Sequence, residues 1–251
     1  MIDAKTLSYI NLYAILGALT QLCELEPKAK EILGKKKITM EIAVKNGPTA
    51  RLAFENGSCK ILSGAGKCNI RLPFSSPEKF NGMIDGTVTP IPSKGLTKIG
   101  FLLKTFVPLT DLLTKYLRPS NDDMKDPEFF RLSTMLTFYV VSEALSQIAN
   151  NDAVGKASAS YIVDGKIKMS IGDIVGSYII AENHVLKTVH EMPEDYTSYM
   201  IFKDINLAND IFTGRVNSVA AVGLGDIRFG GIISQIDNMN RILDRVSMYL
   251  S

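Results

Sequence analysis

Two long apolar runs with helical spacing each precede a series of short strand-like runs. The first apolar run covers about residues 5–25 and the second about residues 132–149, so we expect a helix at the start of each half of the chain. Each half also ends in an amphipathic helix. In these helices apolar residues recur at steps of mostly three and four, at Leu102, Phe106, Leu109, Leu113 and Leu117 and at Ile232, Ile236, Met239, Leu243, Val246 and Leu250.

Short β-type runs separated by turn dipeptides fill the middle of each half. They cover residues 38–44, 50–55, 59–63 and 68–72 in the first half, and 157–163, 166–171, 174–181, 185–189 and 198–202 in the second. Asn46-Gly47, Asn56-Gly57 and Asp164-Gly165 predict two-residue hairpins, because a type I′ turn needs positive φ at both central positions. We therefore expect an antiparallel meander in each half. The fold class is α+β, with mostly antiparallel sheets of about five strands and helices packed on one face.

The second half of the chain repeats the first at an offset of 128 residues. Between Phe74 and Phe101, eight of 28 positions are identical to their counterparts without a gap, where unrelated segments share roughly two. The identical pairs are Phe74/Phe202, Asn81/Asn209, Gly86/Gly214, Val88/Val216, Gly95/Gly223, Leu96/Leu224, Ile99/Ile227 and Phe101/Phe229. This predicts two diverged copies of one domain, at residues 1–117 and 131–251, joined by a polar, proline-bearing linker at 118–130.

The segment around the matched glycines resembles the sterol carrier protein type 2 family. It runs from a strand through a helix ending in glycine to further strands and a closing helix, over residues 74–101 and again over 202–229. The glycines that carry the resemblance are Gly86, Gly95, Gly214 and Gly223. The resemblance implies a five-stranded sheet backed by helices around an apolar tunnel. Domains of this family carry fatty acids, acyl chains, sterols or phospholipids, or serve as non-catalytic modules.

Composition narrows the class of protein further. Apolar residues make up 46% of the chain and charged residues 22%, and the net charge of +2 gives no strong field to attract nucleic acid or an anionic membrane. Three cysteines without CxxC spacing are expected to be reduced thiols in a cytoplasmic protein. The N-terminal apolar run contains Asp3, Asn11 and Glu24, so we expect a buried helix and no transmembrane segment.

The sequence contains no recognisable catalytic or metal-binding pattern. His184 and His190 lack a metal-ligand spacing, and the glycines at 223–231 lack a phosphate-loop pattern. A Gly-x-Ser-x-Gly elbow is absent, and the serines and cysteines have no identifiable base partner. We therefore expect a non-enzymatic protein without catalytic residues, metal or cofactor.

The apolar stripes leave two main interpretations. In the first, they line a cavity for a fatty acid, acyl chain, sterol or similar ligand, because each buried methylene contributes roughly 0.8 kcal/mol. The expected lining residues are Phe80, Met83, Ile84, Phe101 and Phe106 in the first half, and Leu207, Ile211, Phe212, Phe229, Ile232 and Ile236 in the second.

The alternative interpretation is a structural or protein-interaction module, a pseudo-dimer of two repeats whose cavities are filled by side chains. An enzyme with an undetected site has the least support. Because Gly230-Gly231 stand where the first half has Leu102-Leu103, we expect the two cavities to differ and at most one copy to bind. Ligand identity, oligomeric state and any protein partner stay open.

Overall fold

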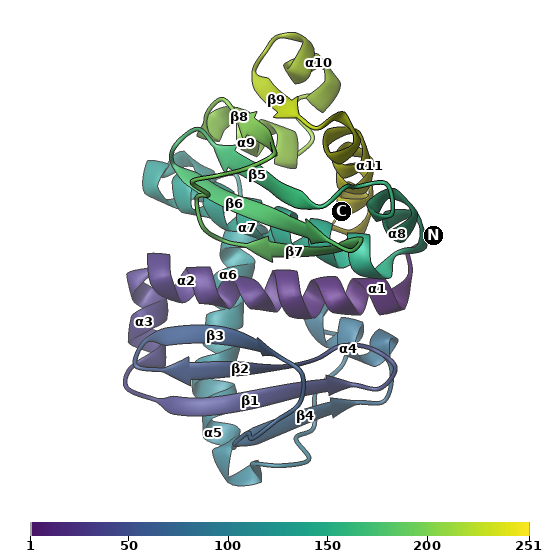
Figure 1. The fold of residues 1–251 in the computed structure, drawn as a ribbon. Coiled ribbons are helices and arrows are strands. Elements are labelled where there is room, and N and C mark those ends of the chain that lie inside the picture. Colours follow the sequence, from purple (N-terminus) through teal and green to yellow (C-terminus); the bar gives the residue numbers. More distant parts are fainter. Residues whose placement is uncertain (1, 251) are drawn as a thin grey trace. The chain divides into compact units, whose positions relative to one another are not determined.

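The computed structural model describes residues 2–250, apart from the side chain of Val219. The chain forms two compact units: unit 1 ends at Met124 and unit 2 begins at Lys125 (Figure 1). This boundary falls within residues 118–130, where the sequence shows a polar, proline-bearing stretch.

Unit 1 contains a mixed four-stranded sheet, whose strands are preceded and followed along the chain by helical segments. Its elements are α1 (Ala4–Tyr9), η1 (Ile10–Ile15), η2 (Leu16–Ala18), α2 (Leu19–Leu25), α3 (Pro27–Leu33), β1 (Lys37–Val44), β2 (Thr49–Glu55), β3 (Ser58–Ser63), β4 (Ile70–Phe74), α4 (Pro77–Ile84), η3 (Leu96–Lys98), α5 (Ile99–Phe101), η4 (Leu102–Phe106) and α6 (Val107–Leu117). A short helical turn, η5 (Asp123–Lys125), spans the boundary between the units.

The strand order of unit 1 is β3-β2-β1-β4. β1, β2 and β3 form the expected antiparallel meander, but β4 pairs with β1 in parallel, so the expectation of a fully antiparallel run of four strands is wrong. Alternation buries one face: β2 buries Ala50, Leu52 and Phe54, and β4 buries Ile70, Leu72 and Phe74. The helical segment from α1 to α2 contacts β3 and α4, and so covers this buried face (Figure 1).

Unit 2 contains a mixed five-stranded sheet with the order β7-β6-β5-β8-β9. Its elements are α7 (Pro127–Asn151), α8 (Ala153–Ala159), β5 (Gly165–Ile171), β6 (Val175–Glu182), β7 (Val185–Val189), β8 (Ser198–Phe202), α9 (Ile205–Phe212), α10 (Ser218–Gly223), β9 (Ile227–Gly231) and α11 (Ile233–Leu250). β5 pairs with β8 in parallel and with β6 antiparallel, as β1 does with β4 and β2. The α+β class with two mixed sheets and packed helices is therefore confirmed.

Two expectations for unit 2 are wrong. The run 157–163 is not a strand; it begins inside α8, because Asp152 caps that helix by accepting hydrogen bonds from the N–H groups of Val154 and Gly155. Asp164 directly precedes β5 and Gly165 is its first residue, so Asp164-Gly165 does not form a hairpin turn. The two-residue turn lies instead at Asn183 and His184, whose φ angles are 50° and 64°.

The fifth strand distinguishes the two units. β9 pairs antiparallel with β8, whereas the corresponding residues of unit 1 are helical. On the edge of β4 that faces away from β1, the described residues form a single bridge, between Arg71 and Lys94. Glycine permits β9 to approach so closely: a Cβ on Gly231 would lie 2.3 Å from the carbonyl oxygen of Thr197. Unit 1 has Leu103 at the corresponding position, where any side chain would meet the clash measured for a Cβ on Gly231 if the segment paired in the same way.

The N-terminal helical stretch Ala4–Leu25 is, by length and composition, apolar enough to cross a membrane. The most apolar window of this stretch is 72% buried within the protein. A buried core helix satisfies the same criterion of length and hydropathy.

Candidate functional site

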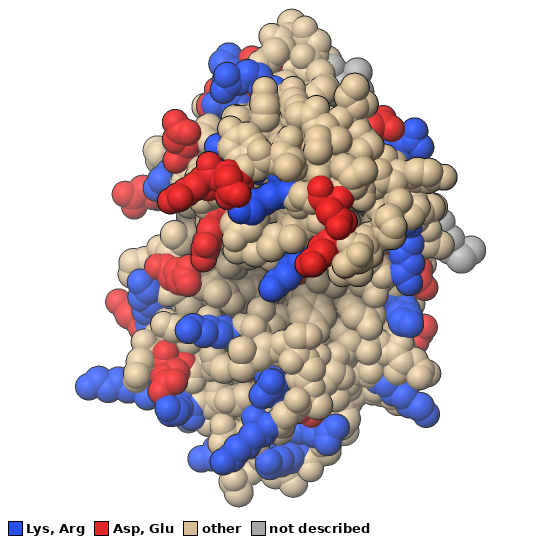
Figure 2. Space-filling view, in the orientation of Figure 1, with Lys and Arg blue, Asp and Glu red and all other residues tan. Residues whose placement is uncertain are grey.

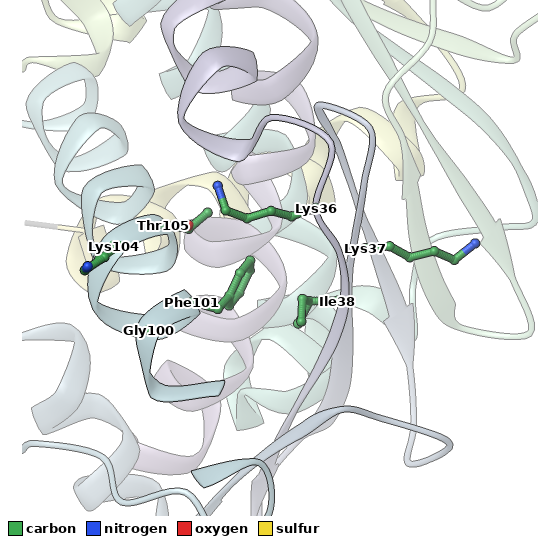
Figure 3. A pocket seen from close by; sticks show the side chains of 7 residues that line it. All are labelled: Lys36, Lys37, Ile38, Gly100, Phe101, Lys104 and Thr105. Atoms are coloured by element: carbon green, nitrogen blue, oxygen red, sulfur yellow. The ribbon is translucent and has the colours of Figure 1, made fainter. Parts of the chain in front are cut away.

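A groove of about 450 Å³ opens in unit 1 between the start of β1 and the helical turns α5 and η4. It is lined by Lys36, Lys37, Ile38, Gly100, Phe101, Lys104 and Thr105. Figure 3 shows Ile38 and Phe101 together at one end, and Lys36 extending toward Thr105 at the other. Lys37 points to the opposite side of the strand, where its Nζ pairs with Glu55 Oε1 at 2.5 Å. The groove therefore has an apolar end and a polar end.

Thr105 provides the most unusual polar group of the groove. Its residue is fully buried, and its Oγ1 has no hydrogen-bond partner in the described part of the chain. In contrast, the hydroxyls of Thr110 and Thr114 on the following helix donate to the carbonyls of Val107 and Thr110, as helical threonines commonly do. A buried hydroxyl without a partner costs about 1–3 kcal/mol, so a ligand that accepts its hydrogen bond recovers that cost.

Thr105 lies in η4, a π-helical turn over Leu102–Phe106. Single π-helical turns are rare and are frequently found at functional sites, because they widen the helix and re-aim its side chains. Here the turn places Lys104 and Thr105 on the wall of the groove while Phe106 stays in the core.

Lys36 is fixed by the end of the preceding helix. α3 ends at Leu33, and its C-cap is Gly34, with a φ of 56°. The Nζ of Lys36 donates to the carbonyl oxygens of Ile32 at 3.1 Å and Leu33 at 3.3 Å. These bonds hold the ammonium group beside the C-terminal end of a helix, where a positive charge is stabilised. The polar end of the groove thus carries a positioned cation.

The two units differ strongly in charge, although the whole chain is nearly neutral. Residues 1–124 contain 17 Lys and Arg and 11 Asp and Glu, a formal charge of +6. Residues 125–251 contain 11 Lys and Arg and 15 Asp and Glu, a formal charge of −4. On the face drawn in Figure 2, unit 1 shows mainly basic side chains, whereas unit 2 shows both acidic and basic ones. The groove therefore lies in the basic unit.

The apolar floor of the groove is continuous with the core of unit 1. Phe101 packs against Phe54 with a ring-centroid distance of 5.4 Å, and Phe106 packs edge-on against Phe54 at 6.3 Å. Phe80 is fully buried against Phe74, with centroids 5.2 Å apart. Of the eleven residues expected from the sequence to line a cavity, Phe101 lines this groove. The others of unit 1, Phe106, Phe80, Met83 and Ile84, lie in the core or half-buried on α4.

In unit 2 the expected lining residues are spread over α9, β9, α11 and the residue between β9 and α11. Phe212 is half-buried on α9 and packs edge-on against Phe202, with centroids 5.5 Å apart. Phe229 and Ile232 are exposed, at 40% and 38%, and Ile236 is buried in α11. Leu207 and Ile211 are half-buried on α9. The structure does not bring these six residues together in either of the two pockets described in this section.

The second pocket, of about 370 Å³, lies in unit 2 and was not anticipated from the sequence. It is lined by Ala149, Asn150, Lys156, Asn183, His184 and Val185. The amide group of Asn150 does not face a ligand freely, because it clamps the backbone of Leu186 through bonds of 2.9 and 2.7 Å. One feature of its lining is visible only in the structure: His184 adopts a positive φ that residues with a side chain seldom adopt.

A polar cluster in unit 2 consists of the buried Ser142 and Ser177 and the half-buried Glu143 and His190. The Oγ of Ser177 lies 3.1 Å from His190 Nδ1, and Ser142 Oγ donates to Ser177 Oγ at 3.2 Å. Glu143 Oε2 lies 3.9 Å from His190 Nε2, and its other oxygen accepts from Gln147. Burial raises the pKa of Glu143 to about 7 and lowers the pKa of His190 to about 4.

This cluster gives His190 a serine partner that spacing in the sequence did not reveal. It resembles a nucleophile, base and acid in composition only. Ser177 lines neither of the two pockets, and its Oγ is already hydrogen-bonded to Ser142 and His190, so it is not placed to attack a substrate carbonyl. The 3.9 Å between His190 and Glu143 is too long for a hydrogen bond. Burial also raises the pKa of Cys23 to about 11 and that of Cys59 further, so both remain protonated thiols at neutral pH.

No protein-family model and no curated protein matches the chain. Similarity is found among solved structures. One is described as a UbiJ-SCP2 ubiquinone synthesis protein, with 14% identity, a TM-score of 0.33, and coverage of 43% of this chain and 88% of that one. Another is a conserved hypothetical protein from Thermus thermophilus described as a candidate sterol carrier protein, with 11% identity, a TM-score of 0.31 and coverage of 44% and 82%.

A third structure is the inverting sec-alkylsulfatase Pisa1 from Pseudomonas sp., with 10% identity and a TM-score of 0.26. The matched region spans 59% of this chain but only 28% of the sulfatase. The printed descriptions of the first two structures refer to SCP2 and to a sterol carrier protein. With TM-scores between 0.26 and 0.33, these three likenesses carry no argument about this chain.

Proposed function

We propose that the protein binds a lipid or a similar amphiphile without converting it chemically, and that the groove of unit 1 holds this ligand. The ligand class that fits best is a fatty acid or another acyl chain with an acidic end group. The observation that carries the proposal is the buried, unpartnered hydroxyl of Thr105 in the wall of a groove with an apolar floor.

The two ends of the groove suit the two ends of such a ligand. A carboxylate accepts hydrogen bonds from Thr105 Oγ1 and from the remaining N–H of Lys36, and charge-assisted bonds of this kind are among the stronger ones. The acyl chain lies on Ile38 and Phe101, where each buried methylene contributes about 0.8 kcal/mol. A volume of about 450 Å³ is within the range of ligand sites, which begins near 300 Å³.

We also propose that the two units arose by duplication of one ancestral domain. The bounds of β4 and β8, and those of α4 and α9, differ by 128 residues at both ends. The caps agree as well: Ser76 and Asp204 each cap the helix through their side chains, and Gly86 and Gly214 follow it with φ of 73° and 71°. An experimental structure in which the two sheets and these helices cannot be superposed would contradict the duplication.

We propose that the protein is cytoplasmic and that each chain binds one ligand molecule. Three free cysteines, two of them buried, support a reducing environment such as the cytoplasm. Because the groove is built by a helical segment that unit 2 replaces with β9, we propose one bound amphiphile per chain. Isothermal calorimetry with a soluble fatty acid measures this number directly, and a value near two would contradict the proposal.

Binding in the groove is tested in solution by measuring how well an unlabelled fatty acid displaces a fluorescent fatty acid from the protein. We expect Thr105→Val to weaken binding of the fatty acid about tenfold, because the isosteric change removes the hydroxyl and keeps the volume. The matched control is Thr110→Val, beyond the groove wall, where the hydroxyl serves only the Val107 carbonyl. Binding of the corresponding methyl ester should change less between the two variants.

Organic extraction of the purified protein, followed by mass spectrometry, identifies any amphiphile that co-purifies. The proposed function would be overturned if an unlabelled fatty acid did not displace the fluorescent probe from the wild-type protein. Equal affinities of Thr105→Val and Thr110→Val would show that the ligand binds elsewhere.

A further inference from the structure

We propose that the helical segment over residues 96–107 docks unit 1 on an anionic bilayer surface. This inference rests on the proposed function, since it names the place from which the groove takes its ligand. It begins from four large apolar side chains that the fold leaves in solvent: Leu96, Ile99, Leu103 and Val107, exposed at 62%, 41%, 64% and 42%. These four residues are called the apolar stripe below.

The apolar stripe occupies one face of a continuous helical stretch. The stretch runs through η3, α5 and η4 into α6, and the four residues follow one another at steps of three, four and four. The opposite face is the one that packs in the core, through Phe101, Thr105, Phe106 and Leu109. An ordinary surface helix presents polar residues to water on its outer face, so this segment is apolar on both faces.

The charges beside the apolar stripe have one sign. Lys94, Lys98 and Lys104 lie within residues 86–110, and this part of the sequence contains no Asp or Glu. Lys98 and Lys104 are exposed, and the whole unit carries a formal charge of +6. Exposed apolar residues flanked by lysines are the composition of segments that lie in the interface of anionic membranes, where lysine stems let the charge reach the headgroups.

The apolar stripe adjoins the mouth of the groove. Gly100 and Lys104, which line the groove, alternate along the helix with Ile99 and Leu103 of the apolar stripe. A bilayer that receives Ile99 and Leu103 therefore meets the same turn that leads to Phe101 and Thr105. This arrangement lets an acidic amphiphile pass between bilayer and groove without crossing water.

Unit 2 provides an internal comparison. It also exposes large apolar residues in the corresponding region, Leu224 at 79% and Ile233 at 83%. However, the charges near them are mixed: Asp226 pairs with Lys203 and Asp237 with Arg241, and the unit carries a formal charge of −4. Leu224 and Ile233 therefore lack the one-signed basic surroundings that would attract anionic lipid, and their substitutions serve as the matched control.

Co-sedimentation of the full chain with vesicles tests the proposal. We expect the wild-type protein to bind vesicles containing phosphatidylglycerol at least tenfold more strongly than vesicles of phosphatidylcholine alone. The double variant Leu96→Ser/Leu103→Ser should lose at least tenfold of this binding, and Lys98→Glu should lose several-fold. The control Leu224→Ser/Ile233→Ser should stay within about twofold of the wild type. High salt should weaken the binding of the wild type.

Two further readouts separate this proposal from the proposed function. Leu96→Ser/Leu103→Ser should bind the fluorescent fatty acid in solution with the affinity of the wild type, which also shows that the variant is folded. Thr105→Val should still sediment with anionic vesicles. Docking is overturned if the wild type does not sediment with anionic vesicles, or if the control variant loses as much binding as the apolar-stripe variant. Sedimentation velocity showing a wild-type dimer that the apolar-stripe variant dissociates would also overturn it, because the surface would then contact a second copy.

Discussion

Asn81 and Asn209, 128 residues apart, each bind the first helical segment of their own unit from the same position in helices α4 and α9. Asn81 Nδ2 donates to the carbonyl of Ala4 at 2.9 Å, and Asn209 Nδ2 donates to Thr134 Oγ1 at 3.2 Å. Both residues are buried, so each ties a helix after the parallel strand to the helix that opens the unit.

Replacing either asparagine with alanine should destabilise its own unit by about 1–3 kcal/mol, because partners are left buried without a hydrogen bond. Hydrogen exchange read by mass spectrometry distinguishes the units: Asn81→Ala should speed exchange in residues 2–124, and Asn209→Ala in residues 125–250. Asn121→Ala, at an exposed site, is the control. Equal acceleration in both units by either variant would refute the independence of the two contacts.

The carboxylate of Asp152 joins the start of α8 to the C-terminal helix. Its Oδ2 accepts from Arg245 Nη2 at 2.7 Å and from Tyr249 Oη at 2.8 Å. Burial disfavours ionisation of this carboxyl, but the hydrogen bonds from Arg245, the Gly155 N–H and Tyr249 outweigh it and hold the pKa below its usual range.

Arg245→Met should therefore lower the free energy of unfolding at pH 7 by about 3 kcal/mol, because a buried carboxylate loses its cation. A depressed folded pKa stabilises the protein above the unfolded value of about 3.9, and this contribution is lost as the pH falls below that value. The deficit of the variant should thus shrink in urea titrations below pH 4. Arg241→Met, which breaks the exposed pair with Asp237, should cost less than about 0.5 kcal/mol.

Glu143 and His190 should give the stability of unit 2 two opposing pH dependences. The pKa of Glu143 is raised to about 7, so its protonated form stabilises the fold below the unfolded value of about 4.3 and this contribution is lost as the pH rises toward 7. The pKa of His190 is lowered to about 4, so its contribution is present above about 6.5 and is lost as the pH falls toward 4.

In the wild type these two contributions largely cancel between pH 4.5 and 6.5. Glu143→Gln should leave only the histidine, and unfolding should become easier on acidification by at most about 3 kcal/mol. His190→Phe should show the opposite slope, with stability that rises as the pH falls from 7 to 4.5. Chemical denaturation at four pH values measures both slopes, and parallel slopes in the two variants would disprove the assignment.

His184 occupies a turn position with a φ of 64°, where its counterpart in the β2–β3 turn of unit 1 is Gly57 with a φ of 79°. Side chains are strained in this conformation, so His184→Gly should stabilise the protein by about 1 kcal/mol. The reciprocal variant Gly57→His should destabilise it by a similar amount. Thermal unfolding followed by circular dichroism tests the pair, and a loss of stability in His184→Gly would mean that the histidine side chain makes a compensating contact.

The sequence predicted elements whose signals are local. The strands β1, β2 and β3, the helix ends at Gly86 and Gly214, and the correspondence between β4 and β8 follow from periodicity, turn residues and the 128-residue offset. The same local reasoning failed for residues 157–163, since their apolar pattern fits a strand as well as a helix. The cap that Asp152 provides decided between the two.

By itself, the sequence determined the α+β class and the order of most elements. Only the tertiary structure decided that β4 runs parallel to β1, that Thr105 is buried beside Lys36 and Phe101 in a groove, and that Arg245 meets Asp152. The physical reason is range. Periodicity, caps and turns act over a few neighbouring residues, whereas a groove or a buried ion pair depends on which distant surfaces pack together.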